Sequence, residues 1–332
     1  MTSPPTSQPL YTSTFSISYD NTELNTLDIH RPTISPLIPS YWLIYIHGGA
    51  FRDPLVDSTS IIPSLPFIFA SSHHIAAVAS LNYRLSPHPR HPTHPSGPGI
   101  FQGRTAKWPD HINDVRDAIW WLRKKGGLVE GQEWIVSGHS VGGTMAMMLG
   151  MDSMSTREQD KNWPGGIWGA EGGDGSAERV LSLEGLRAVV SIEGIYDFTA
   201  CRDTHMHLRD MYEDFTTGAF GPKWANWDRG DILRCGRRVR VGVEVVVGHS
   251  KEDELVEWEQ AEKIMEVLKR RGSPFRPWGP ELVELQGEHQ EVVRGGIGVG
   301  KCVSAAVELL IDKEEDKETS PIRERVELLG PA

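Results

Sequence analysis

Residues 138–142 read Gly-His-Ser-Val-Gly and place Ser140 at the centre of a Gly-x-Ser-x-Gly pattern. The pattern follows the apolar run 133–137 and precedes a helix-like segment, so it predicts a sharp turn between a strand and a helix. Glycines flank the serine because the two backbones nearly touch in such a turn. The turn would hold the Ser140 hydroxyl above a sheet, at a helix N-terminus that stabilises a developing anion. A simpler interpretation is a serine that caps a helix.

A second loop, residues 47–51 (His-Gly-Gly-Ala-Phe), follows the apolar run Tyr41–Ile46. Acyl transfer needs backbone N–H groups that point at the tetrahedral oxyanion, and a His-Gly-Gly loop after an early strand supplies them. Gly48 would let this loop approach closely. The expected oxyanion hole consists of the N–H groups of Gly49, Ala50 and Val141. Alone, the loop favours an ordinary strand-to-loop turn, and its pairing with the elbow in the expected chain order makes the oxyanion interpretation specific.

A serine nucleophile requires a base, and the base requires a carboxylate that orients it. With this elbow, the acid and then the histidine come later in the chain. We expect Asp253, which follows the run 239–247, to be the acid, although an acidic helix N-cap is a competing interpretation. Glu252 and, less favoured, Asp197 are the alternative acids. His289 lies in the loop directly after the last apolar run, 282–285, and is the expected base.

Elements that could position these residues alternate along the chain. Short apolar runs predict buried strands at 41–46, 75–81, 133–137, 188–192, 239–247 and 282–285. Apolar residues at every third or fourth place predict helices at 111–124, 141–151, 253–270 and 303–312. Repeated strand–helix–strand units favour an α/β class with a mostly parallel sheet and helices on both faces.

Three stretches interrupt that alternation. Residues 88–107 are rich in Gly and Pro, and residues 162–175 are rich in Gly. Residues 200–236 contain short amphipathic pieces with many aromatic side chains and are interpreted as a small cap or lid inserted into one domain. The expected organisation is a flexible tail at 1–15, one domain at 16–312 and a charged tail at 313–332.

Composition limits the function further. The 332 residues include 34 Lys and Arg against 45 Asp and Glu, a net charge of −11 that argues against nucleic-acid and anionic-membrane partners. No apolar run is long enough for a membrane span, and the first residues do not resemble a signal peptide. Three cysteines without a glycosylation sequon fit a reducing compartment. We therefore expect a soluble cytoplasmic protein with a small-molecule substrate.

Together, these motifs resemble the esterase/lipase branch of the α/β-hydrolases. Within that branch, the chain is most similar to the kynurenine formamidases (arylformamidases), particularly the fungal ones, over about residues 40–310. Beyond the elbow, the matching segments are 47–54, 83–87, 108–115, 193–197, 218–221 and 249–255. The family usually has Trp where Phe51 stands, in a His-Gly-Gly-x-Trp motif. Further departures are residues 141–143, 228–230 and the stretch 162–175.

The resemblance implies an α/β-hydrolase fold and hydrolysis of N-formyl-L-kynurenine to L-kynurenine and formate in tryptophan degradation. It implies a Ser140–Asp253–His289 triad, a formyl-enzyme intermediate, no cofactor and, by analogy, a homodimer. Four aromatic residues of the loops and the cap could stack on the aryl ring, although core packing is the favoured interpretation of each: Phe51, Tyr83, Phe220 and Trp224. Arg52 could meet the substrate carboxylate, but an ion pair with Asp53 or another acid is the favoured interpretation.

Other functions remain open at this stage. The same groups would serve a carboxylesterase acting on short acyl esters. A non-catalytic small-molecule receptor on this fold would not need all of Ser140, Asp253 and His289. Residues 295–302 nearly match a phosphate-binding loop but have Cys302 in place of the Ser or Thr that binds Mg²⁺. The histidines at 88, 91 and 94, and the pair at 205 and 207, lack the spacing of a helical zinc pair, so we expect no metal.

Overall fold

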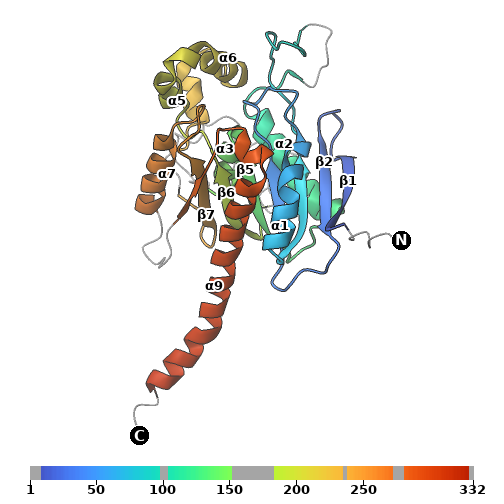
Figure 1. Cartoon of the computed structure of the whole chain (residues 1–332), viewed down its shortest axis with the longest axis vertical. Coiled ribbons are helices and arrows are strands. Elements are labelled where there is room, and N and C mark those ends of the chain that lie inside the picture. The colour runs from blue at the N-terminus through green and yellow to red at the C-terminus, as the bar shows by residue number, and fades with distance from the viewer. Residues whose placement is uncertain (1–8, 98–103, 152–182, 235–237, 272–279, 329–332) are drawn as a thin grey trace, which may run out of the picture.

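The computed structural model describes residues 9–97, 104–151, 183–234, 238–271 and 280–328, and the glycine-rich stretch 162–175 lies outside them. An eight-stranded sheet with the order β1-β2-β4-β3-β5-β6-β7-β8 forms the centre (Figure 1). Six strands from β4 to β8 run parallel, whereas β2 is antiparallel to both of its neighbours. The strands are β1 (Tyr11–Ser18), β2 (Thr26–Pro32), β3 (Tyr41–Ile46), β4 (Ile75–Leu81), β5 (Glu133–His139), β6 (Leu186–Ile192), β7 (Glu244–Ser250) and β8 (Glu281–Leu285).

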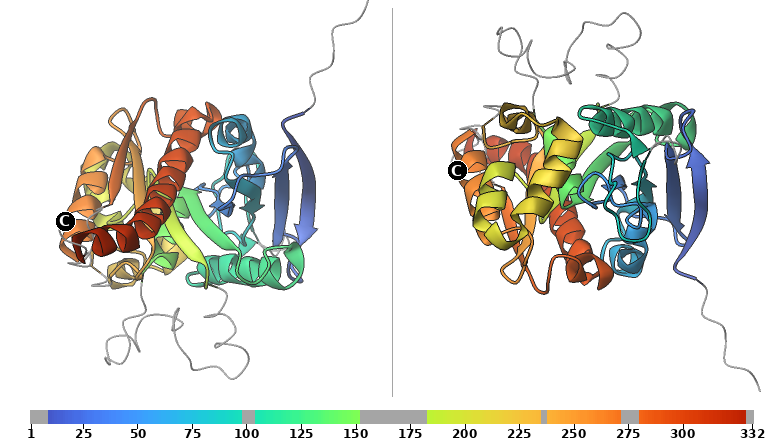
Figure 2. Two further views of the ribbon diagram at one scale, coloured as in Figure 1. Left: turned by 90° about the horizontal axis from the view of Figure 1, so that it is seen from below. Right: turned by 90° about the horizontal axis from the view of Figure 1, so that it is seen from above.

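Helices cover both faces of this sheet (Figure 2). The described helices are η1 (Ser58–Ser64), α1 (Leu65–Ser71), α2 (Asp110–Trp121), η3 (Leu122–Gly126), α3 (Val141–Leu149), α5 (Phe198–Thr204), η5 (Met206–Leu208), α6 (Arg209–Phe220), η6 (Trp224–Arg229), α7 (Trp258–Arg271), α8 (Glu291–Arg294) and α9 (Ile297–Leu328). None of the helices in these described segments is both long and apolar enough to cross a bilayer.

The core divides into two apolar layers, one on each face of the sheet. Side chains alternate along β3, so Trp42 and Ile44 join the layer of α2, α3 and α7, whereas Leu43 and Tyr45 join the layer of α1 and α9. All of these side chains are buried. Burial on both faces explains why the central strands are continuous apolar runs, and the expected α/β class is confirmed.

The N-terminal boundary differs from the sequence prediction. Residues 11–15, expected in a tail, belong to β1, and neither β1 nor β2 was predicted. Strand β1 lies at the sheet edge with exposed and half-buried polar residues, so it lacks the apolar run that marks the central strands. At the other end, the charged segment from residue 313 continues helix α9 as far as Leu328.

Two further boundaries were predicted too early. Strand β7 begins at Glu244 and not at residue 239, because Val241 is exposed and Gly242 turns the chain with φ +83°. Helix α7 begins at Trp258 and not at Asp253, because the Asp253 side chain accepts the N–H groups of Leu255 and Val256 in a turn. The charge-rich residues before α7 thus form a loop.

The carboxyl ends of the parallel strands lie along one edge of the sheet. Ile46 pairs with Gly138, His139 with Ile192, and Ser250 with Leu285. Every residue that follows these positions therefore emerges on the same side of the molecule. Helices α5 and α6, with η5 and η6, are inserted between β6 and β7, and α5 and α6 lie together at one end of the molecule (Figure 1).

The first turn of α3 lies against the ends of β3 and β5 without room for a side chain. A Cβ atom on Gly142 would lie 2.2 Å from the carbonyl oxygen of Ile46, and one on Gly138 would lie 2.2 Å from the carbonyl oxygen of Gly142. Real Cβ atoms do not approach backbone this closely. The flanking glycines of the Gly-x-Ser-x-Gly pattern are therefore steric requirements of the fold.

We predict that Gly142→Ala lowers the free energy of unfolding by at least about 1–3 kcal/mol, because the added methyl group must displace backbone. Urea denaturation at equilibrium measures the change. Gly218→Ala is the matched control, because Gly218 lies within helix α6 and a Cβ atom there would make only an ordinary 3.5 Å contact with the Pro87 carbonyl oxygen. It should leave stability unchanged or raise it by up to about 1 kcal/mol. Equal stability of both variants would contradict the steric interpretation.

Candidate active site

Ser140 joins β5 to α3 in a backbone conformation that L-residues rarely adopt, with φ 56° and ψ −127°. Its N–H donates to the carbonyl of Ile192 at 2.9 Å, which fixes the turn against β6. The Ser140 side chain makes no capping hydrogen bond to α3, so the simple helix-cap interpretation is wrong. The residue is 6% exposed. A strained turn that frees its hydroxyl is the geometry of a nucleophile elbow.

The glycine loop after β3 lies directly beside Ser140. A Cβ atom on Gly48 would lie 3.1 Å from the Ser140 Cβ atom, so glycine permits the approach. Gly49 and Ala50 both have left-handed backbone, with φ 86° and φ 50°. No hydrogen bond among the described residues uses the N–H of Gly49 or Ala50. Free N–H donors beside the serine suit an oxyanion hole.

Tyr83 holds this loop in place through contacts with His47 and Gly48. Its hydroxyl points at the carbonyl oxygens of His47 and Gly48, at 3.0 and 2.9 Å, and its ring stacks on the His47 ring at 4.3 Å. The Ser86 N–H donates to the Phe51 carbonyl at 2.8 Å. The segment 83–87 therefore holds the glycine loop in its left-handed path. Tyr83 is 1% exposed, so it is a support of the loop and not a surface for an aryl ring.

The loops after β7 and β8 bring the expected acid and base together. His289 Nδ1 lies 2.7 Å from Asp253 Oδ2, and both side chains are buried. The other Asp253 oxygen accepts the N–H groups of Leu255 and Val256 at 2.9 and 2.8 Å. Burial raises the pKa of Asp253, but the hydrogen bond from His289 and the Val256 N–H outweigh it, so the pKa is lowered. A fixed carboxylate thus orients the His289 ring.

The two alternative acids have other partners. Glu252 is exposed and accepts the Gly287 N–H at 2.7 Å. Asp197 caps helix α5 by accepting the Ala200 N–H at 2.8 Å and also pairs with Arg234. Neither carboxylate contacts the imidazole of His289 in the described part of the chain. Asp253 is therefore the carboxylate that is placed to serve this histidine.

Two buried residues that were not predicted from the sequence link Ser140 to the histidine loop. His139 precedes Ser140, and its Nε2 lies 3.0 Å from both Glu193 Oε2 and the His289 carbonyl oxygen. The rings of His139 and His289 lie 4.5 Å apart. Glu193 follows β6 with φ 49°, and its Oε2 lies 3.5 Å from His289 Nδ1. A carboxylate directly after a buried parallel strand was the available signal, but only Asp197 was considered.

Glu193 and Asp253 form a pair of carboxyl groups with opposite pKa shifts. Burial is the main cause that raises the pKa of Glu193 to about 10. The negative charge of Asp253 and the hydrogen bond between Glu193 and Asp253 raise it further. Burial is the main cause that lowers the pKa of His139, and the nearby His289 ring is the second cause. At neutral pH Glu193 is therefore a carboxylic acid, Asp253 a carboxylate and His139 neutral. Among the described residues the Ser140 hydroxyl makes no hydrogen bond to His289, so the two must approach each other for proton transfer.

The aromatic residues considered for substrate stacking pack against one another. Phe51 is fully buried, with ring centroids 6.1 Å from Trp108, 6.2 Å from Phe198 and 5.6 Å from Phe220. Phe220 is likewise buried. These rings pack the glycine loop against the cap as part of the core. The Trp224 side chain lies outside the described residues. Arg52 is also structural, as the favoured interpretation predicted: it pairs with Asp214 of α6 at 2.5 Å, and not with Asp53.

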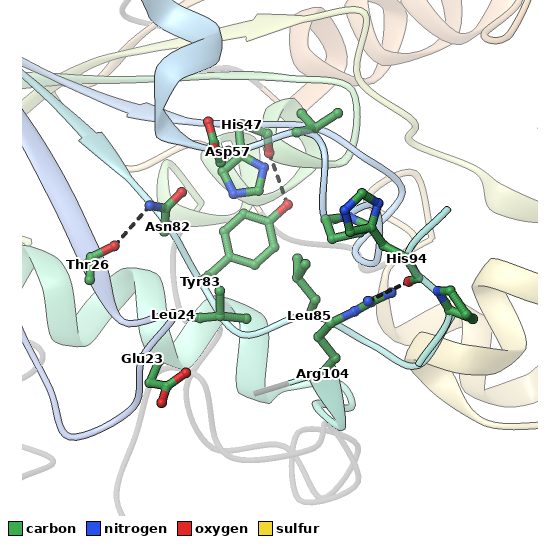
Figure 3. Close-up of a pocket in the computed structure, with 13 residues that line it drawn as sticks. Glu23, Leu24, Thr26, His47, Asp57, Asn82, Tyr83, Leu85, His94 and Arg104 are labelled. Carbon is green, nitrogen blue, oxygen red and sulfur yellow. Dashed lines mark hydrogen bonds between the residues drawn. The ribbon is translucent and has the colours of Figure 1, made fainter. Parts of the chain in front are cut away.

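A cavity of about 470 Å³ lies next to the glycine loop (Figure 3). It contains none of Ser140, Asp253 and His289, and only His47 belongs to the loop. The lining residues are Glu23, Leu24, Thr26, His47, Pro54, Val56, Asp57, Asn82, Tyr83, Leu85, His94, Pro95 and Arg104. Figure 3 shows the Tyr83 hydroxyl bonded toward His47, and Arg104 bonded to the His94 carbonyl. This cavity is separate from the candidate active site.

The near match to a phosphate-binding loop has a different structure. Residues 297–302 form the start of helix α9, so no strand and loop precede Lys301 as a phosphate site requires. A Cβ atom on Gly296 would lie 2.1 Å from the Pro63 carbonyl oxygen, and Gly300 packs on Phe67. Glycines in this segment let α9 approach η1 and α1. The structure therefore explains this motif by packing.

Known sequences resemble this chain over most of its length. The sequence model of the BD-FAE family matches residues 101–268, half of the chain. The chain is similar to the kynurenine formamidase-like hydrolase of Fusarium equiseti, with 29% identity over 311 residues that cover 88% of this chain and 93% of that one. It is 27% identical to the kynurenine formamidase of Aspergillus versicolor, over 85% of this chain and 94% of that one.

Comparison with solved structures addresses the fold. Esterase B of Lactobacillus rhamnosis superimposes with a TM-score of 0.61 at 13% identity, covering 94% of this chain and 89% of that chain. The expected α/β-hydrolase fold is thereby confirmed.

We predict that Glu193→Gln makes the stability of the protein less dependent on pH. A carboxyl group whose pKa is raised by folding stabilises the native state fully below its unfolded pKa, and that contribution is lost as the pH rises toward about 10. The free energy of unfolding of the wild type should therefore fall more steeply between about pH 6 and 9 than that of the variant, by up to about 1.4 kcal/mol per pH unit.

Chemical denaturation at several pH values measures the two slopes. Glu252→Gln is the control, because this neighbouring carboxyl group is exposed. It should leave the slope of the wild type unchanged. Parallel slopes for the wild type and Glu193→Gln would mean that Glu193 is ionised in the folded protein and would refute the prediction.

Proposed function

Because the chain belongs to the BD-FAE family and has the α/β-hydrolase fold, we propose that it is a serine hydrolase that cleaves N-formyl-L-kynurenine to L-kynurenine and formate. One observation carries the mechanism: the 2.7 Å bond between Asp253 and His289, in loops that meet beside the elbow of Ser140. The kynurenine formamidases among the relatives, matched over most of their length, support the substrate.

In the proposed first step, His289 accepts the proton of the Ser140 hydroxyl while the oxygen attacks the formyl carbon. The carbonyl oxygen becomes an oxyanion that the N–H groups of Gly49, Ala50 and Val141 stabilise. One such donor typically contributes a factor of about 10²–10³ to the rate. The Asp253 carboxylate stabilises the imidazolium that forms on His289.

In the proposed second step, the imidazolium of His289 donates its proton to the aniline nitrogen as the C–N bond breaks, and L-kynurenine leaves. The formyl group remains on Ser140 as an ester. Water then attacks this ester with His289 again as the base, and formate leaves. All groups needed come from the chain itself, so the mechanism uses no cofactor.

We predict that purified protein releases kynurenine from N-formyl-L-kynurenine and that Ser140→Ala lowers kcat by at least about 10⁴-fold. Absorbance of the aniline product follows the reaction, with a short p-nitrophenyl ester measured in parallel. Cleavage of the ester without release of kynurenine would retain Ser140 as the nucleophile and identify a carboxylesterase. Failure of both reactions, with no labelling of Ser140 by a fluorophosphonate, would favour a non-catalytic receptor.

We further predict that Tyr83→Phe lowers kcat by about tenfold and changes KM little, because the glycine loop loses its two carbonyl contacts and the oxyanion donors lose their alignment. Steady-state kinetics on the preferred substrate measures both constants. Tyr41→Phe is the matched control, since it removes a buried hydroxyl that has no hydrogen-bond partner among the described residues. Equal kcat values for the two variants would contradict a role of Tyr83 in the loop.

A further inference from the structure

A second cluster of metal-ligating side chains lies under the cap. It comprises Cys201 and His205 from the region of α5 and Glu257 from the loop before α7, all buried. One ligand atom from each residue lies within 4.8 Å of the other two. In the described part of the chain, only one other such group exists, formed by His139, Glu193 and His289. The Cys201 cluster is therefore distinct from the candidate active site.

Spacing and distance both suit a shared metal ion. Cys201 and His205 are four residues apart, and the His205 N–H donates to the Cys201 carbonyl at 3.1 Å, so one helical turn presents both side chains on one face. His205 Nε2 lies 3.4 Å from Glu257 Oε2. This is long for a hydrogen bond, but two ligands of a tetrahedral zinc ion lie about 3.4 Å apart.

The same two atoms lack hydrogen bonds. His205 Nε2 and Glu257 Oε2 are buried without a hydrogen-bond partner among the described residues, and Glu257 is 7% exposed. Buried polar atoms without partners are costly, and a bound cation would satisfy both at once. Their only mutual contact is the 3.4 Å approach that a cation would bridge.

Neighbouring residues orient the cluster. Gln260 Nε2 donates to Glu257 Oε1 at 2.7 Å, which leaves Oε2 directed at His205. The His205 ring stacks on the Tyr212 ring at 5.8 Å, and the Tyr212 hydroxyl donates to the Leu255 carbonyl. Ligands of metal sites are commonly held by such outer contacts. The three side chains are thus positioned before any ion binds.

We propose that Cys201, His205 and Glu257 bind a thiophilic divalent cation, for which zinc is the best fit, with water as the fourth ligand. A thiolate with an imidazole and a carboxylate selects zinc over magnesium and calcium, which prefer oxygen ligands. The Cys201 thiol releases its proton to solvent when the cation binds. The sequence prediction of no metal considered histidine pairs alone and overlooked Cys201, four residues before His205.

Such a cation would join the cap to the loop that carries the acid. Glu257 follows Asp253 by four residues, and Leu255 between them already accepts hydrogen bonds from Cys201 Sγ, at 3.4 Å, and from the Tyr212 hydroxyl. The bound cation would therefore stabilise the acid loop against α5 without contacting substrate. Its first measurable effect is on stability.

The test uses the full chain with Cys235→Ser and Cys302→Ala, so that Cys201 is the only cysteine. After removal of metals with a chelator, Co²⁺ serves as a spectroscopic probe and Zn²⁺ is titrated by calorimetry. We expect one equivalent of either cation, a thiolate-to-cobalt absorption band and a melting temperature raised by several degrees with zinc. Cys201→Ser should abolish the band, and Glu257→Gln or His205→Gln should weaken zinc binding at least about 100-fold.

Circular dichroism of the metal-free variants checks that each is folded, and the isosteric Glu257→Gln carries the test if Cys201→Ser fails to fold. Absence of stoichiometric binding to the parent protein would overturn the proposal. Binding that survives Cys201→Ser and disappears in His139→Gln would also overturn it, because the ion would then lie beside Ser140. Hydrolysis of N-formyl-L-kynurenine is a separate measurement, so loss of one proposal does not decide the other.

Discussion

The site depends on how closely the first turn of α3 approaches the ends of β3 and β5. Gly138 and Gly142 lie against backbone on both sides of Ser140, so the chain has no alternative path through this turn. This confinement holds Ser140 at a positive φ and keeps its hydroxyl away from the N–H groups of α3. The glycine loop after β3 rests on the same surface through Gly48. The candidate nucleophile and the candidate oxyanion donors are thus positioned by one packing constraint.

Electrostatics at the site follows from burying two carboxyl groups together. Asp253 accepts hydrogen bonds from two backbone N–H groups and bonds to the His289 ring. Glu193 is hydrogen-bonded to the His139 ring and lies close to the Asp253 charge. Two adjacent carboxyl groups are not both ionised in a buried environment, so the one that accepts more hydrogen bonds, Asp253, keeps the charge. Glu193 then acts as a neutral hydrogen-bond partner. It positions Asp253 and the histidine loop without adding a second negative charge beside His289.

Sequence patterns predicted what depends on local chain order. The central strands are apolar runs because they are buried on both faces, and the residues after them inevitably meet at one sheet edge, which brings Asp253 to His289. Strand β1 was not predicted because this edge strand has no continuous apolar run. His139 and Glu193 were missed because their importance arises from contacts across fifty residues or more, which no spacing reveals. Cys201 was missed because its third partner, Glu257, is supplied by tertiary structure.

In the proposed reaction the elbow, the glycine loop and the Asp253–His289 pair would serve esters and formamides alike, so the cap is left to distinguish substrates. Its contacts converge on the catalytic loops: Arg52 of the glycine loop pairs with Asp214 of α6, and Tyr212 of α6 bonds to Leu255 of the acid loop. In the proposed reaction the formyl group would occupy little space on the acyl side, so selection would act on the aryl and amino-acid portion of the substrate. Because the cap contacts both loops, we expect a change in its packing to alter the alignment of the proposed reacting groups. On the proposed function, the packing of the cap therefore bears on substrate choice and on the geometry of the reacting groups together.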